Sequence, residues 1–273
     1  MTEISLVVEI DEEDPQCAVV LVDGAISGHA YRFVLDTGAS RTQVVADAFI
    51  DTLETSGEHH SHGIFSPSTQ RTVQLPDLEV GPICSSSIEA SVAVDTHGIV
   101  HPLIGMDLLK DHRLQFCFDR GVLIVDETAV GHELHPLVVD DAHHLYVEAS
   151  WPTASASCVW DSGAGMTIVD KEFWTQHRDI FKSLGTSQGT DASGVQQAST
   201  TYEVDSPVIG GHRFAPHHVA VVDLSVPNSS LAKPMDMILG YSTIRRANWL
   251  FDVSLLLWGI TECFNEPLCD RCT

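Results

Sequence analysis

The stretch FVLDTGASRTQVV, from Phe33 to Val45, ends an apolar run with an aspartate and follows it with a hydroxyl residue, a glycine and an alanine. A buried carboxylate costs free energy unless another group pairs with it or donates hydrogen bonds to it. A similar stretch, CVWDSGAGMTIVD, starts 125 residues later at Cys158. The two stretches align Asp36 with Asp161, Thr37 with Ser162, Gly38 with Gly163 and Ala39 with Ala164. The second stretch therefore supplies a candidate partner for Asp36.

The aspartate motif is one of four blocks that recur in the same order. PLIGMDLL at 102–109 resembles MILGYSTI at 237–244, and LQFCFDRGVLIVDE at 114–127 resembles NWLFDVSLLLWGITE at 248–262. Between the motif and these blocks, each copy carries a strand, a glycine turn and a second strand. A short motif arises easily by chance, but an ordered set of four indicates internal duplication.

The local pattern is that of an all-β protein. Short β-branched and aromatic runs such as CAVVLVDG, YRFVLDTG and VLIVDE are separated by Gly, Pro, Ser and Asp turns. Helical periodicity is confined to brief pieces near ADAFIDTLET, MDLLKDH and VDKEFWTQHRDIF. Gly, Pro and acidic residues cluster between Asp126 and Asp141, which favours a boundary near residue 131. We therefore expect two halves, 1–131 and 132–273.

Composition excludes several classes of function. The 273 residues carry a formal charge of −24, so nucleic acid and anionic membranes are not expected partners. No apolar run is long enough for a membrane helix and the first residues do not read as a signal peptide, which favours a cytoplasmic protein. Seven scattered cysteines do not indicate a disulfide framework, and most are expected to be buried thiols.

On these motifs the chain resembles a retropepsin-type aspartic protease duplicated into one chain, pepsin-like in connectivity but with small halves. The resemblance implies two homologous β-barrel domains related by a pseudo-twofold axis, with the active site at their interface. It implies that Asp36 and Asp161 form a catalytic dyad. It further implies support of the dyad by the residues that follow each aspartate, namely Thr37, Gly38, Ala39, Ser162, Gly163 and Ala164.

The chemistry of such a dyad needs no cofactor. Two carboxyls in one site cannot both ionise cheaply, so they share a proton, a behaviour for which aspartic-protease dyads are the standard example. The ionised member can deprotonate water while the protonated member hydrogen-bonds the scissile carbonyl. The sequence leaves open which of the two aspartates carries the proton.

The family covers its substrate with hairpin flaps. The candidates here have Gly63, Ile64 and Phe65 near the first tip and Gly194 and Val195 near the second. Since both half-sites lie in one chain, a monomer acting on a peptide or protein substrate is expected.

The chain also departs from the retroviral pattern. The family's acidic residue after the motif is replaced by Ser40 and Gly165, and its Arg-Asn pair by Met106-Asp107 and Tyr241-Ser242. The support that those groups give is therefore lost or replaced. Thr42 and Thr167 can be read as plain strand residues.

Histidine and cysteine clusters raise the question of a metal. HHSH at 59–62, the pairs at 143–144 and 217–218, and CDRC at 269–272 each lack a second set of ligands at metal-binding spacing. We interpret the histidines as solvated surface residues and expect no metal.

Two functions of different classes are compatible with these patterns. The first is an aspartic endopeptidase, and the alternative is a catalytically silent, protease-derived peptide-binding module. The intact pair of motifs favours the enzyme, because a binding module has no chemical reason to keep two repelling carboxylates together.

Overall fold

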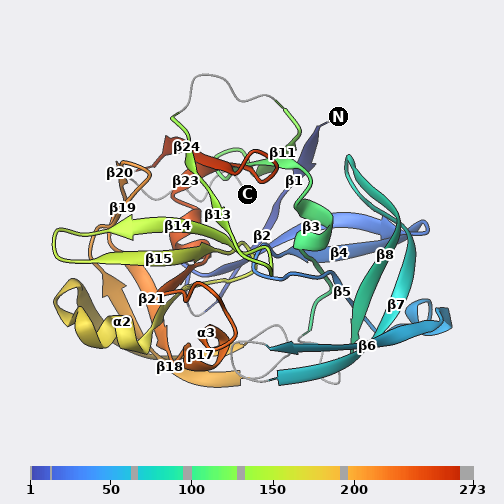
Figure 1. Cartoon of the computed structure of the whole chain (residues 1–273), viewed down its shortest axis with the longest axis horizontal. Coiled ribbons are helices and arrows are strands. Elements are labelled where there is room, and N and C mark those ends of the chain that lie inside the picture. Colours follow the sequence, from blue (N-terminus) through green and yellow to red (C-terminus); the bar gives the residue numbers. More distant parts are fainter. Residues whose placement is uncertain are drawn as a thin grey trace.

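The computed structural model describes residues 2–12, 14–62, 67–94, 100–127, 133–190 and 196–264. In these ranges the chain consists mainly of β-strands arranged in three sheets, with only short helices (Figure 1). The prediction of an all-β protein is confirmed. The predicted boundary at residue 131 lies outside the described residues.

The first motif belongs to an eight-stranded sheet in the order β2-β3-β4-β9-β5-β8-β7-β6. Its strands are β2 (Val7–Ile10), β3 (Ala18–Ile26), β4 (His29–Leu35), β5 (Gln43–Val45), β6 (Thr55–His62), β7 (Pro67–Val80), β8 (Ile83–Ala93) and β9 (Leu103–Ile104). Strand β4 ends directly before Asp36, and it pairs in parallel with β9 through Leu35 and Ile104.

The second motif belongs to a ten-stranded sheet in the order β17-β18-β21-β16-β22-β15-β14-β19-β20, with β13 paired to β14. Its strands are β13 (Val138–Val139), β14 (Leu145–Ser150), β15 (Ser155–Trp160), β16 (Thr167–Asp170), β17 (Phe181–Thr190), β18 (Gln196–Val204), β19 (Val208–Ile209), β20 (His212–Arg213), β21 (His217–Val222) and β22 (Met237–Leu239). Strand β15 ends directly before Asp161 and pairs in parallel with β22 through Trp160 and Leu239.

A third sheet of six strands, in the order β1-β11-β10-β23-β24-β12, takes strands from both ends of the chain. Its strands are β1 (Glu3–Ser5), β10 (Arg113–Cys117), β11 (Val122–Val125), β12 (His135–Pro136), β23 (Ala247–Asp252) and β24 (Leu257–Cys263). The pairing of β10 with β23 joins the segments that follow the two motifs. The expectation of two β-barrel halves did not include this sheet.

The helices are brief. They are η1 (Ile50–Thr52), α1 (Met106–Leu109), α2 (Lys171–Gln176), η2 (Arg178–Ile180), α3 (Ser225–Asn228) and α4 (Tyr241–Ile244). The first four lie near the stretches with predicted helical periodicity, α4 corresponds to α1 in the repeated block, and α3 lies where no helix was predicted. None of the helices in these ranges is both long and apolar enough to cross a membrane.

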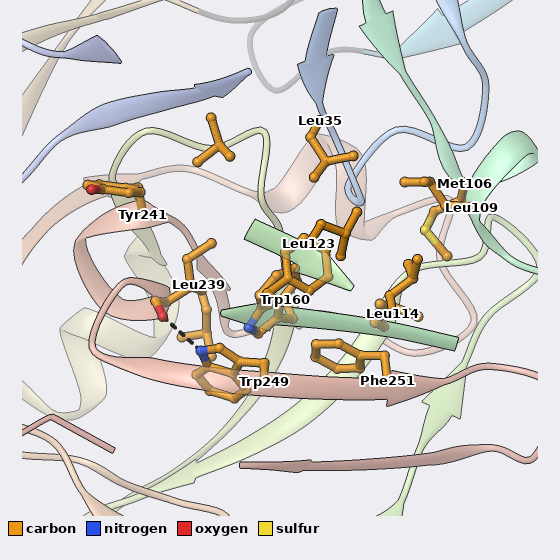
Figure 2. Packing of buried hydrophobic residues seen from close by; sticks show 14 of the residues in the cluster. Leu35, Met106, Leu109, Leu114, Leu123, Trp160, Leu239, Tyr241, Trp249 and Phe251 are labelled. Atoms are coloured by element: carbon orange, nitrogen blue, oxygen red, sulfur yellow. Dashed lines mark hydrogen bonds between the residues drawn. The ribbon is translucent and has the colours of Figure 1, made fainter. Parts of the chain in front are cut away.

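The main core forms where the six-stranded sheet packs against the strands that precede the aspartates. Trp160 is fully buried there, with ring centroids 4.6 Å from Phe116 on β10 and 4.8 Å from Phe251 on β23. Figure 2 shows Trp160 and Leu35, the residues directly before the two aspartates, above Phe251 and Trp249. The strands that precede the two aspartates therefore pack on the same hydrophobic core.

The cysteines differ from expectation. Among the described residues Cys117 and Cys158 are buried, Cys17 and Cys263 are partly exposed, and Cys84 is exposed, all as free thiols. The prediction that most are buried is wrong for this part of the chain. Cys17 directly precedes β3, and Cys263 ends β24 and packs against the edge of the main core, so neither thiol is fully enclosed.

Candidate active site

Asp36 and Asp161 occupy equivalent positions in their sheets, each one residue beyond the end of a strand. The amide of Asp36 donates to the carbonyl of Ile104 at 3.0 Å, and the amide of Asp161 donates to the carbonyl of Leu239 at 3.0 Å. Each aspartate is only 9% exposed. The parallel pairings with β9 and β22 thus hold both backbones at the point where the side chains leave the sheets.

Main-chain amides converge on the two carboxylates. Gly38 and Ala39 donate to Oδ1 of Asp36 at 3.0 and 2.9 Å, and Gly163 donates to Oδ1 of Asp161 at 2.8 Å. Gly38 also lies across the interface, with its amide 3.2 Å from Oδ1 of Asp161. One loop therefore contacts both carboxylates, which brings the predicted pair together.

The glycine after each hydroxyl residue lies against the opposite carboxylate. A Cβ added at Gly38 would overlap the carboxylate of Asp161, and one added at Gly163 would overlap that of Asp36. Only a residue without a side chain permits this approach. Each loop therefore places its glycine against the carboxylate of the other loop.

Thr37 and Ser162 interlock the two loops beneath the carboxylates. The Thr37 hydroxyl donates to the carbonyl of Trp160 at 3.1 Å and accepts the amide of Ser162 at 3.1 Å. In return, the Ser162 hydroxyl donates to the carbonyl of Leu35 at 2.6 Å and accepts the amide of Thr37 at 3.2 Å. Both side chains are buried, so these bonds are shielded from competing water.

Burial and mutual repulsion disfavour a doubly ionised pair. Burial raises the pKa of Asp36 well above its usual range, and the neighbouring charge of Asp161 raises it further. Burial also raises the pKa of Asp161, against the opposing effect of the hydrogen bonds from Gly163 and from Asp36. A pair that holds one proton between its carboxyls is the state that this arrangement favours.

A second layer of hydrogen bonds supports each loop through different side chains. In the first half the amide and hydroxyl of Thr42 donate to Asp107, at 2.9 and 2.8 Å, and the Gly105 amide donates to the Thr42 hydroxyl. Burial raises the pKa of Asp107 despite these hydrogen bonds. Thr42 is therefore more than a plain strand residue.

In the second half the Thr167 amide donates to the hydroxyl of Ser242 at 3.0 Å, and the Gly240 amide donates to the Thr167 hydroxyl at 3.1 Å. Asp107 and Ser242 thus hold the segments that follow the two aspartate loops, each through a threonine. The only sequence signal for this role is that each follows the glycine of its repeated block by two positions.

This network continues to a buried histidine. The hydroxyls of Thr167 and Thr243 are 2.6 Å apart, and Thr243 lies 2.6 Å from Nε2 of His217, whose Nδ1 is 2.9 Å from the carbonyl of Ala215. Burial lowers the pKa of His217 to about 3. The interpretation of the paired histidines as solvated surface residues is wrong for His217, which is 1% exposed.

Two long hairpins occupy the positions of the predicted flaps. Strands β6 and β7 pair from Thr55↔Val73 to His62↔Pro67, and β17 and β18 pair from Phe181↔Val204 to Thr190↔Gln196. The hairpins lie along the lower edge of Figure 1, from opposite sides of the molecule. The predicted tip residues Gly63, Ile64, Phe65, Gly194 and Val195 lie outside the described residues.

Metal-ligating side chains do not gather around the carboxylates. Within the described ranges, no group of three or more His, Cys, Asp or Glu residues could hold a metal ion. The CDRC sequence at 269–272 lies outside those ranges.

The first half of this site matches a known family. A family model described as gag-polyprotein putative aspartyl protease matches residues 22–111, which include Asp36 and extend through α1. No curated protein matches the chain. The family match supports a retropepsin-like aspartic protease, and it ends well before Asp161.

Proposed function

We propose that the chain is an aspartic endopeptidase in which Asp36 and Asp161 together activate water. The observation that carries this proposal is the convergence of the two loops, in which the Gly38 amide contacts Oδ1 of both carboxylates. The family match of the first half supports the same class of enzyme.

The active unit is one chain with two related halves. Support comes from corresponding strand pairings: β4 with β9 and β15 with β22 around the aspartates, and β5 with β8 and β16 with β21 beside them. These pairs are all parallel, in sheets whose other pairings are mostly antiparallel. We attribute the correspondence to a pseudo-twofold axis between the aspartates, with the halves spanning 1–131 and 132–273.

The reaction begins with a water molecule held between the two carboxyls. The ionised carboxylate accepts a proton from this water as its oxygen bonds to the scissile carbonyl carbon, while the protonated carboxyl donates its proton to the carbonyl oxygen. The resulting tetrahedral diol collapses with cleavage of the C–N bond. A proton returned to the nitrogen lets the amine leave, and the dyad regains its single proton.

The two hairpins cover an extended peptide in this scheme. A peptide in extended conformation presents backbone donors and acceptors that strands can pair with, which suits a site lined by β6, β7, β17 and β18.

The deciding experiment is cleavage of a mixed peptide library, with and without a statine-type transition-state mimic. Wild type and Asp111→Asn, which removes an exposed carboxylate, should cleave and be inhibited. Asp36→Asn and Asp161→Asn should lose about 10³-fold or more in turnover while keeping the native fold. Substantial activity in either folded dyad variant would exclude the mechanism. Peptide binding without cleavage by wild type would favour the binding module.

A further inference from the structure

A histidine lies next to one member of the pair and has no counterpart beside the other. Strands β14 and β15 pair up to Leu145↔Trp160, and His144 and Asp161 are the next residues beyond this last pair. In the first half β3 and β4 pair up to Leu21↔Val34. Extending this register by two positions places Val19 at the position equivalent to His144, opposite Asp36. The two aspartates therefore have different neighbours across the sheet.

The alternation of the strands places His144 and Asp161 on one face. Leu145 and Val147 of β14 and Trp160 of β15 point into the main core, whereas Tyr146 and Val159 belong to a smaller cluster on the opposite face. Successive side chains of a strand point to opposite faces. His144 and Asp161 lie one position beyond the ends of β14 and β15, so continuing the alternation would direct both side chains toward the face of the smaller cluster.

The imidazole is held in place by a carboxylate. Nδ1 of His144 is 2.8 Å from Oδ2 of Asp140, whose Oδ1 accepts the amides of Ala142 and His144 at 3.0 and 2.9 Å. The side chains of His144 and Asp140 are 17% and 8% exposed. Within the described part of the chain, Nε2 of His144 has no hydrogen-bond partner. Asp140 thus fixes the ring and leaves Nε2 for other contacts.

We propose that His144, held by Asp140, is a positioning residue that makes the pair asymmetric, keeping Asp161 as the ionised member and leaving the shared proton on Asp36. This inference rests on the proposed function. In the first step Asp161 then accepts the proton of the attacking water, and Asp36 donates its proton to the substrate carbonyl oxygen.

Electrostatics agree with this assignment. The charge of His144 acts to lower the pKa of Asp161, against the effect of burial, and it is not among the main influences on the pKa of Asp36. A protonated imidazole near a carboxylate stabilises its ionised form.

Other charged groups around the histidine come from neighbouring elements. The Tyr146 hydroxyl is 3.2 Å from Oδ2 of Asp140 and donates to the carbonyl of Lys233 at 2.7 Å, while the Lys233 ammonium lies over the Tyr146 ring. Nζ of Lys110, the residue after α1, is 3.4 Å from Nε2 of His143. Asp141 lies two positions before His143. Hydrogen bonds from His144 and Tyr146 lower the pKa of Asp140 although burial acts to raise it. Asp140 therefore stays ionised beside the imidazole of His144.

The test is a carboxyl ¹³C NMR titration of single-aspartate variants, which does not require catalysis. In an Asp36→Asn background, His144→Val should raise the pKa of Asp161 by about 0.5–1 unit. In an Asp161→Asn background, the same change should leave the pKa of Asp36 within about 0.2 unit, whereas Val19→His should lower it. His144→Gln, which keeps a polar side chain of similar length, replaces His144→Val if the latter does not fold.

In the otherwise unmodified enzyme, His144→Val should move the acidic limb of the kcat/KM profile to higher pH, with Val19→Leu as the control that leaves it unmoved. An unchanged Asp161 titration, or equal shifts at both aspartates, would overturn the proposal. Since the titration does not depend on turnover, an inactive protein that shows the asymmetric shift would count against the proposed function alone.

Discussion

The hydroxyl of Ser162 donates a hydrogen bond of 2.6 Å to the carbonyl of Leu35, the residue directly before Asp36. Together with the reciprocal bond from Thr37 to the carbonyl of Trp160, it ties each aspartate to the loop of the other. The geometry of the pair therefore depends on hydroxyls that do not touch the carboxylates themselves.

Removing one of these hydroxyls should destabilise the protein. Thr37→Val leaves the buried amide of Ser162 without an acceptor, which costs about 1–3 kcal/mol. Thr37→Ser keeps the hydroxyl and should lose much less. Urea denaturation followed by fluorescence measures both, and equal stability of the Val and Ser variants would contradict the role of the hydroxyl.

Filling the space beside either carboxylate should separate the pair. Gly38→Ala and Gly163→Ala each introduce a methyl group where the opposite carboxylate lies, so turnover should fall by about 10²-fold or more. Asp111→Asn is the control, because this exposed side chain lies outside the aspartate loops and the hairpins. The idea fails if all three variants retain similar kcat/KM.

The raised pKa of Asp36 predicts how stability depends on pH. A carboxyl whose pKa is higher in the folded state stabilises the fold at pH values below its unfolded pKa, and this contribution is lost as pH rises through the folded pKa. Asp36→Asn removes this titration, and with it the cost of keeping the carboxyl protonated at neutral pH, so its Tm should exceed that of wild type at pH 7. The difference should disappear near pH 3. Thermal denaturation across this range checks the sign, and a less stable variant at pH 7 would contradict it.

The alanine after each motif glycine predicts the positions of the two limbs of the pH–rate profile. Ala39 offers only its amide to Asp36, at 2.9 Å, so a hydroxyl introduced by Ala39→Ser can add a donor that stabilises the ionised carboxylate. Since the shared proton is assigned to Asp36, the basic limb of the pH–rate profile should then move down by about one unit. Ala164→Thr should lower the acidic limb, which follows the ionisation of Asp161. Limbs that stay in place would show that these positions do not set the titration.

Buried His217 predicts a loss of stability in acid. Its pKa of about 3 lies below the ordinary value near 6.5, so the folded state resists a proton that the unfolded chain accepts. The contribution is complete above pH 6.5 and is lost progressively toward pH 3, amounting to about 2 kcal/mol by pH 5. Imidazole NMR should show a neutral ring at pH 5, and His217→Gln should flatten this part of the stability curve. Titration of His217 near pH 6.5 would refute the prediction.

The sequence was sufficient for the parts of the site that repeat with the same chemistry. Each aspartate is followed by a hydroxyl residue and a glycine in both copies of the motif, and the structure brings all of these residues together. The hydrogen bonds that support the aspartate loops could not be predicted from the repeat. Asp107 and Ser242 do equivalent work with a carboxylate and a hydroxyl, so alignment of side-chain types finds no correspondence.

Burial of a polar residue was likewise beyond a local pattern. His217 lies in a pair of polar residues, and its burial is compensated by hydrogen bonds with the carbonyl of Ala215 and with the hydroxyl of Thr243, which is 26 positions away. The six-stranded sheet was not predicted for a similar reason. Its central pairing joins β10 to β23, two strands far apart in the sequence, and no local pattern near β10 identifies β23 as its partner.

The ladder between β10 and β23 has a consequence for synthesis of the chain. Arg113 bonds to Asp252 across 139 positions, and β23 starts only at Ala247. Until that segment leaves the ribosome, β10 presents an open edge whose backbone groups can pair with any passing strand. The growing polypeptide is thus exposed to association at this edge while the residues between Cys117 and Ala247 are synthesised.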